Sequence, residues 1–175
     1  MARVEVPEQR IIPDPPAGWA SWAELMALAL EEARLNLGDA GGEPGEVPVG
    51  ALVLGRDGRI LGRGRNSPIR DSSPVAHAEV NALMEAGRAL GNYRLYGAVL
   101  VVTLEPCLMC AAAAAHARLA GVVYGAADEA AGALHSRLNA LDLDFLNHRP
   151  WTLGGILEDE CSALLRAFFA GKRGA

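Results

Sequence analysis

The chain has 175 residues, of which 51% are hydrophobic and 21% are charged. At roughly 150 residues per domain this length leaves room for one domain, and the composition excludes a globally disordered chain. The formal net charge of -5 argues against indiscriminate nucleic-acid binding, and no apolar run approaches the roughly 18 residues of a membrane-spanning helix.

The N-terminal residues and the cysteines predict a cytoplasmic protein. Residues 1–18 contain four prolines and lack the apolar core of a secretory signal. We therefore expect a flexible tail, followed by a single domain over residues 19–175. The three cysteines are an odd number, and two of them stand three residues apart, so reduced thiols or metal ligands are favoured over a disulfide framework.

Hydrophobic periodicity predicts alternating strands and helices. Apolar residues at intervals of three and four mark a helix over 19–37 with Ser21 as its N-cap, and a turn at Asp57-Gly58 joins two strands. These strands cover 49–55 and 59–64, and they are followed by a helix over 76–90, a buried strand over 98–104, a helix over 107–119, a strand over 122–125, a helix over 130–141, a strand over 151–156 and a helix over 158–170. This order predicts a three-layer α/β/α fold around a mixed sheet of about five strands.

Two short motifs at predicted helix starts carry the residues with metal chemistry. His77 and Glu79 stand in His-Ala-Glu, and Cys107 and Cys110 stand in Pro-Cys-Leu-Met-Cys. Cysteines at i and i+3 share one helical face, and Pro106 suits the first helical position. The helix dipole at each N-terminus favours thiolate over thiol. The spacing therefore predicts one site built from both motifs.

Two thiolates and one imidazole are suitable ligands for Zn²⁺. Three protein ligands leave a fourth position open, which is typical of a catalytic site that holds water. Glu79 points away from His77 around an ideal helix, but near the first turn its long side chain can reach that water as general acid and base. A structural zinc module remains the alternative; it would recruit a fourth protein ligand, and Cys161 is the only spare thiol.

The two motifs resemble the signature of the zinc-dependent cytidine and deoxycytidylate deaminases. Further stretches between about residues 22 and 170 resemble the bacterial tRNA-specific adenosine deaminases within that superfamily. These stretches are EVPVGALV at 46–53, NSPI from Asn66, PVAHAE, NYRL at 92–95, VTLEPCLMCAAA, VVYGA at 122–126, LNHR at 146–149 and GILEDECSALL. The resemblance implies a cytidine deaminase-like fold and conversion of adenosine to inosine at the wobble position of a tRNA anticodon stem-loop. It also implies a homodimer with one zinc ion per subunit.

The resemblance also implies roles for residues outside the metal motifs. Asn66 is expected to hydrogen-bond the flipped base, and Val47 to line its pocket. Asn147, His148 and Arg149 are expected to lie beside the RNA. From the residues alone, Asn66 is equally well explained as a side chain that orders a turn before Pro68, and the 147–149 segment as a solvated loop.

Some positions depart from the family pattern. The usual aspartate four residues before the histidine is Ser73 here, and a basic pair after the 122–126 strand is absent, with Ala127 in that segment. Five arginines between Arg56 and Arg70 are expected to compensate as RNA contacts, although a solvated hairpin face explains them as well. The acidic net charge and the missing basic pair keep open a rival function, deamination of a free nucleobase or nucleoside of the guanine or cytosine type.

Overall fold

A mixed five-stranded sheet forms the centre of the molecule. The computed structural model describes residues 13–37 and 45–173. The strands are β1 (Gly50–Leu54), β2 (Ile60–Arg65), β3 (Val99–Leu104), β4 (Gly121–Ala126) and β5 (Trp151–Leu153), in the spatial order β2-β1-β3-β4-β5. β1 runs antiparallel to β2 and β3, whereas β3, β4 and β5 are parallel. The predicted mixed sheet is therefore confirmed.

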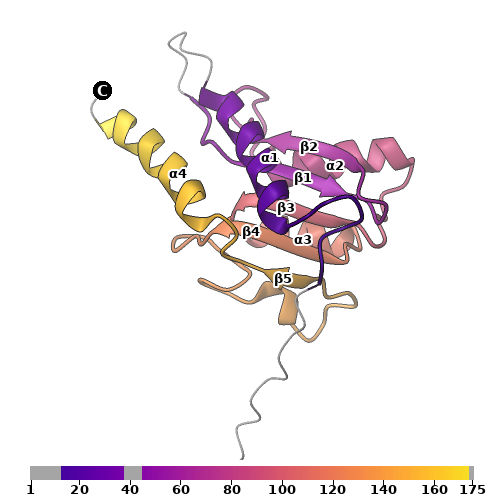
Figure 1. The fold of residues 1–175 in the computed structure, drawn as a ribbon. Helices are drawn as coiled ribbons and strands as arrows, with labels where there is room; N and C mark the ends of the chain where they lie inside the picture. The colour runs from indigo at the N-terminus through magenta and orange to yellow at the C-terminus, as the bar shows by residue number, and fades with distance from the viewer. Residues whose placement is uncertain (1–12, 38–44, 174–175) are drawn as a thin grey trace, which may run out of the picture.

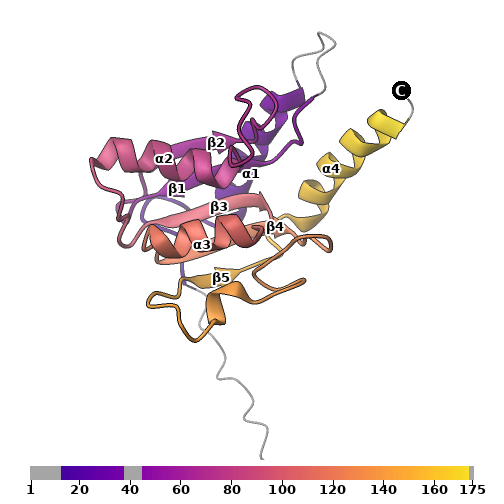
Figure 2. The same cartoon turned by 180° about the vertical axis from the view of Figure 1, so that it is seen from behind.

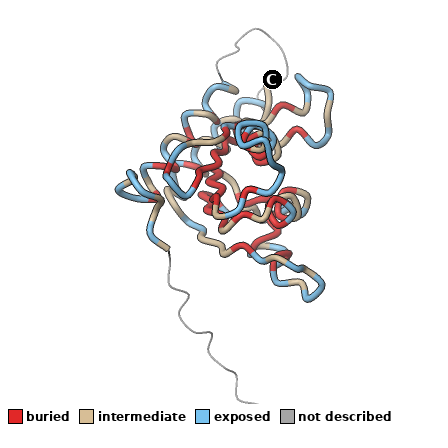
Figure 3. The backbone as a smooth tube through the Cα atoms, turned by 90° about the vertical axis from the view of Figure 1, so that its right-hand side faces the viewer, coloured by how far each residue is buried: buried red, intermediate tan, exposed pale blue. Residues whose placement is uncertain are grey.

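Helices cover both faces of the sheet. α1 (Trp22–Arg34) lies on one face, and α2 (Ala78–Leu90) and α3 (Leu108–His116) lie on the other (Figures 1 and 2). α4 (Glu158–Arg173) extends from the end of the sheet, and short 3-10 turns occupy Leu35–Leu37 and Ala140–Asp142. Buried residues follow the sheet and the inner helix faces (Figure 3), in one core cluster beneath each helix layer. The three-layer prediction is confirmed.

Local signals account for the first elements. The hydroxyl of Ser21 accepts the backbone N–H of Glu24 at 3.2 Å, as expected for an N-cap. Gly58 has a φ of 77° in the turn between β1 and β2, which glycine adopts without steric cost. The predicted end of the first helix at Gly38 lies outside the described residues.

Part of the predicted tail also lies outside the described residues, which begin at Pro13. The described part, residues 13–18, forms no regular element, as its prolines predict. It is nevertheless held against the domain, because the indole N–H of Trp22 donates to the carbonyl of Pro13 at 2.8 Å.

The predicted helix over 130–141 is wrong. That segment consists of turns and ends in the 3-10 turn Ala140–Asp142. Backbone N–H groups of residues 134–136 donate to the carboxylate of Glu105 instead of to carbonyls within a helix, and Gly132 forms a β-bridge with Cys107. A smaller correction concerns Pro106, which precedes the N-cap Cys107 and so does not occupy the first helical position.

Helix α2 packs directly onto the backbone of β2. A Cβ atom added at Gly64 would lie 2.1 Å from the carbonyl oxygen of Ala78 and 2.5 Å from the backbone nitrogen of Ala82. Gly62 is in similarly close contact with the next turn of the helix. Since Ala78 is the first residue of α2, these glycines determine how closely the helix start approaches the sheet.

We predict that Gly64→Ala lowers the free energy of unfolding by roughly 1–3 kcal/mol, the usual cost of overpacking a close contact. Gly87→Ala is the matched control within α2, because its added Cβ would meet only the carbonyl of Asn92 at 3.5 Å. This control should gain roughly 0.5–1 kcal/mol from its higher helix propensity. Urea denaturation measures both, and a Gly64→Ala protein as stable as the parent would contradict the close-packing account.

Candidate metal centre

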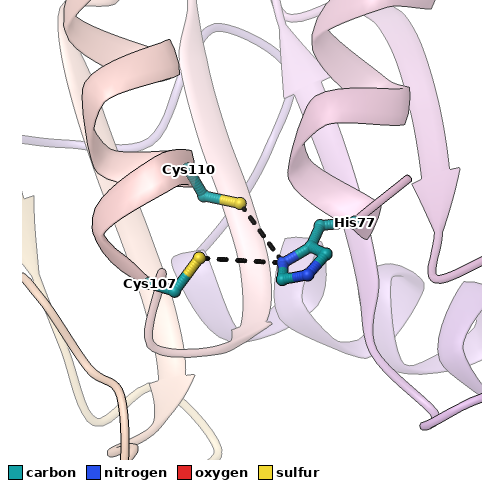
Figure 4. Close-up of side chains that lie close together, drawn as sticks. All are labelled: His77, Cys107 and Cys110. Atoms are coloured by element: carbon teal, nitrogen blue, oxygen red, sulfur yellow. Dashed lines mark hydrogen bonds between the residues drawn. The ribbon is translucent and has the colours of Figure 1, made fainter. Parts of the chain in front are cut away.

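Two helix N-termini bring three ligand atoms together. His77 is the N-cap of α2, Cys107 is the N-cap of α3, and Cys110 lies in the first turn of α3. The Nδ1 atom of His77 lies 3.7 Å from Sγ of Cys107 and 3.6 Å from Sγ of Cys110 (Figure 4). All three ligand atoms lie within 4.8 Å of one another. The predicted meeting of the two motifs is therefore observed.

These distances fit a tetrahedral zinc ion. Zinc binds thiolate sulfur at about 2.3 Å and imidazole nitrogen at roughly 2.0–2.1 Å, so a tetrahedral angle separates sulfur from nitrogen by roughly 3.6 Å. The observed separations of 3.6 and 3.7 Å match this value. Among the described residues, no further histidine, cysteine or carboxylate joins the group. The donor set thus suits zinc with one position open.

The spare thiol lies elsewhere in the fold. Cys161 is buried in α4 and belongs to the core cluster on the α1 side of the sheet, where burial raises the pKa of its thiol to about 11. It is a protonated core side chain rather than a fourth ligand. All three cysteines are free, as the sequence predicts, and the closed four-ligand site required by a structural zinc module is not formed by these residues.

The two thiols near His77 differ in proton affinity. A hydrogen bond from the Cys110 thiol lowers the pKa of Cys107 to about 5, and it outweighs the opposing effect of burial. Backbone N–H groups of the first turn of α3 lower the pKa of Cys107 further. The same hydrogen bond, together with burial, raises the pKa of Cys110 above its ordinary value. One thiolate and one thiol therefore coexist before a metal binds.

Glu79 reaches this group from the first turn of α2. Its side chain is only 4% exposed, and its carboxylate interacts with the side chains of His77, Cys107 and Cys110. Burial raises the pKa of Glu79 above its ordinary value, and the nearby Cys107 thiolate raises it further. A carboxylate whose pKa is raised by burial, beside an open metal position, can both take and return protons.

One predicted substrate-binding residue bonds directly to the backbone beside a metal ligand, and a second is linked to it. The side-chain carbonyl of Asn66 accepts the backbone N–H of Ala78 at 2.9 Å, directly after His77. Val47 is connected to it through Asn36, whose amide donates to the backbone carbonyls of Asn66 at 2.9 Å and Val47 at 3.5 Å. Asn36 was missed by sequence analysis, because nothing in a helix-end asparagine indicates contacts 11 and 30 residues away.

The 147–149 segment lies away from the metal ligands of the same chain. Arg118, just beyond the C-terminal end of α3, donates to the side chain of Asn147, and a ring nitrogen of His148 lies 2.6 Å from the carbonyl of Leu119. Arg149 donates to the carbonyl of Leu143 at 3.2 Å. The metal ligands occupy the opposite end of α3, on the order of 14 Å away at 1.5 Å per residue. Residues 147–149 are therefore remote from the metal ligands of their own chain.

Three of the five clustered arginines already have acidic partners. Arg59 pairs with Asp57 at 2.8 Å. Arg63 pairs with Glu32 at 3.0 Å, and Arg70 pairs with Asp71 at 3.1 Å. These pairs reduce the positive charge that the sequence suggested for this stretch, although exposed pairs hold their partners weakly. The RNA role of the arginines remains a prediction.

Comparison with known proteins identifies the motifs independently. The family model described as the zinc-binding region of cytidine and deoxycytidylate deaminases matches residues 21–126. A tRNA-specific adenosine deaminase of Haemophilus influenzae is 42% identical over 150 residues, which cover 86% of this chain and 84% of that protein. A tRNA(Ile)-lysidine synthase of Deinococcus radiodurans is 46% identical over 151 residues, but the match spans only 26% of that longer protein.

Solved structures show the same architecture. A structure from studies of A-to-I editing by tRNA deaminases at the wobble position superposes with a TM-score of 0.75 and 39% identity, covering 81% of this chain and 99% of that chain. The guanine deaminase from Nitrosomonas europaea superposes with a TM-score of 0.67 and 27% identity, covering 87% of this chain and 86% of that chain. The cytidine deaminase-like fold expected from the resemblance is confirmed.

We predict that zinc binding at pH 7 releases about one proton from the thiol pair, because metal ligation requires two thiolates and Cys107 is already ionised. Below about pH 5 Cys107 also becomes protonated, so the thiol pair should release up to two protons and zinc affinity should fall more steeply. Calorimetric titration in buffers of different ionisation enthalpy measures this number. Release of two protons at pH 7 would show that both thiols are protonated in the metal-free protein.

Proposed function

The chain belongs to the cytidine and deoxycytidylate deaminase family, and we propose that it deaminates adenosine to inosine at the wobble position of a tRNA anticodon, with one zinc ion per subunit. The main support for this proposal is the match to a tRNA-specific adenosine deaminase along most of both chains. In addition, His77, Cys107 and Cys110 lie close enough together to bind one metal ion. A cytoplasmic location is expected for an enzyme that acts on tRNA and keeps its thiols reduced.

The reaction replaces an exocyclic amine with an oxygen from water. His77, Cys107 and Cys110 would hold the zinc ion, which would supply a Lewis acid to activate water. The Glu79 carboxylate is placed to take a proton from the attacking water as oxygen bonds to the amine-bearing carbon, and to pass it to the adjacent ring nitrogen. A second proton travels from the added hydroxyl through Glu79 to the amine, which leaves as ammonia when the carbon–nitrogen bond breaks.

The surroundings of Glu79 suit this shuttle. A carboxylate in water would hold its proton too weakly to return it near neutral pH, whereas burial raises the pKa of Glu79. Its backbone position in the first turn of α2 also fixes its distance from His77, two residues earlier. The chain thereby supplies a proton carrier in a fixed position beside the metal.

We assign base recognition to Asn66 and one wall of the pocket to Val47. Because the side-chain oxygen of Asn66 already accepts the N–H of Ala78, which fixes the side chain, we assign the contact with substrate to its amide NH₂. This amide donates hydrogen bonds only, so it selects an acceptor such as an unprotonated purine ring nitrogen. Val47, which packs against the core on the α2 and α3 side, provides an apolar surface for the base.

The rival function, deamination of a free nucleobase, has weaker support. The guanine deaminase from Nitrosomonas europaea shares the fold at 27% identity, whereas the adenosine deaminase of Haemophilus influenzae is 42% identical. These similarities favour an anticodon stem-loop as substrate. Asn147, His148 and Arg149 remain proposed RNA contacts, and their place at the far end of α3 suits nucleotides outside the pocket.

We also propose that two copies associate through the α2 and α3 layer. A groove of about 810 Å³ lies between these helices, and its lining is largely apolar, with Val80, Leu83, Met84, Ala113 and Ala117 among the residues. Met84, in this groove, is 50% exposed, so the groove presents apolar side chains to solvent. Burial of this surface in a symmetric pair would account for its apolar character.

No helix in the described ranges combines the length and apolar content needed to cross a bilayer.

If this surface holds the dimer together, Met84→Asp should shift the mass in solution from twice 18.4 kDa to 18.4 kDa, because a carboxylate would be buried without a partner. Leu37→Asp is the control, since Leu37 is comparably exposed but follows α1 on the other side of the sheet. Light scattering coupled to gel filtration measures both. A dimeric Met84→Asp protein would place the interface elsewhere.

The substrate proposal is tested with zinc-loaded protein and an anticodon stem-loop that carries adenosine at the wobble position. We expect inosine at that position by sequencing and one ammonia per inosine, with no ammonia from guanine or cytidine. Glu79→Ala should retain zinc but lose roughly 10²- to 10⁴-fold in turnover, the usual contribution of general acid and base catalysis. Ammonia from a free base alone would support the rival, and near-normal turnover by Glu79→Ala would remove Glu79 from the mechanism.

A further inference from the structure

Glu105 is a second buried carboxylate, and the reaction above assigns it no role. It follows β3 directly and precedes Cys107 by two residues. Its side chain is 2% exposed, and no basic side chain in the described ranges pairs with it. A buried carboxylate without a cationic partner is stable only when hydrogen-bond donors replace its hydration. The identity of those donors therefore indicates what the residue does.

The donors all come from the segment after β4. One carboxylate oxygen of Glu105 accepts the backbone N–H groups of Leu134 at 3.0 Å, His135 at 2.7 Å and Ser136 at 2.9 Å. The other oxygen accepts the N–H of Asp128 at 3.1 Å and the hydroxyl of Ser136. Five donors from residues 128–136 thus surround one side chain, and this segment has no helix of its own.

The segment held by Glu105 bonds in turn to the backbone of a metal ligand. Gly132 forms a β-bridge with Cys107, and the N–H of Ala133 donates to the carbonyl of Pro106 at 2.9 Å. A Cβ added at Gly132 would lie 2.4 Å from a carboxylate oxygen of Glu105, so only glycine fits there. The carboxylate and the bridge therefore form one closed unit around Pro106 and Cys107.

We propose that Glu105 is a positioning residue of the metal centre: it holds the 128–136 segment, and that segment fixes the backbone of Cys107 and hence the direction of its thiolate. The inference rests on the proposed metal centre and adds to it a residue that touches neither metal nor substrate. Removing a group that orients a ligand typically weakens metal binding or activity by about 10- to 100-fold.

Glu105→Gln tests this with little change in shape. A carboxamide has one acceptor oxygen and one donor nitrogen, so one of the two sets of donors would face an N–H group. We expect zinc binding, measured by competition with a chelator, to weaken by about 10- to 100-fold. The visible spectrum of the cobalt-substituted protein should shift, because thiolate ligation changes. The backbone N–H groups of residues 134–136 should exchange faster with solvent even in the metal-free protein.

Leu52→Ala is the matched control for lost stability alone. Leu52 is fully buried in the core cluster on the α1 side of the sheet, away from the helix layer that carries the metal ligands. It should lower the melting temperature yet keep the parent zinc affinity and cobalt spectrum. Unchanged zinc affinity and spectrum in Glu105→Gln would overturn the proposal. So would an equal loss of zinc affinity in Leu52→Ala, because stability alone would then explain the effect.

Ser136→Ala provides the same test should Glu105→Gln fail to fold. It removes one of the five donors, so we expect zinc binding weaker on the order of fivefold, as for one lost hydrogen bond. Parent-like zinc affinity in this variant would count against the proposal. Zinc affinity, the cobalt spectrum and amide exchange do not depend on the substrate. If the enzyme did not act on tRNA, the variants should still show these changes. If the enzyme edited tRNA but the variants showed no such changes, only the role of Glu105 would be refuted.

Discussion

The metal site depends on two helices whose N-termini lie close together. α2 starts after His77 and α3 starts after Cys107, on the same face of the sheet (Figure 2). The partial positive charge of a helix N-terminus stabilises thiolate ligands, and ligands from two separate elements fix the metal position only if both helices are held firmly. Gly64 allows α2 to rest on the backbone of β2, so the sheet itself sets the separation of the two helix starts.

Polar side chains of the chain hold the loops on both sides of this point. On one side Asn36 joins the backbones of Val47 and Asn66, and Glu46 accepts the N–H groups of Ile69 and Arg70 at 2.8 and 2.9 Å. On the other side Glu105 gathers residues 128–136. Loops organised in this way can present a rigid pocket without regular secondary structure. The metal ligands and the proposed base-binding residues are thus held by one scaffold.

The metal ligands could be predicted from the sequence more easily than the residues that hold the surrounding loops in place. His77, Cys107 and Cys110 were predicted because ligand type and helical spacing are local properties, and the Asp57-Gly58 turn was predicted for the same reason. The expected helix over 130–141 was wrong because its N–H groups bond to Glu105, about 30 residues earlier in the chain. The remote position of Asn147 is likewise set by packing at the end of α3, which no local pattern reports.

The metal centre is expected to hold a single zinc ion with three protein ligands and one open position. X-ray absorption at the zinc edge of the substrate-free protein tests it most directly, because it counts sulfur neighbours and lighter neighbours separately. We expect one zinc ion per chain, with two sulfur atoms at about 2.3 Å and two nitrogen or oxygen atoms at roughly 2.0–2.1 Å from the metal. A third sulfur neighbour, or a zinc environment without sulfur, would contradict it.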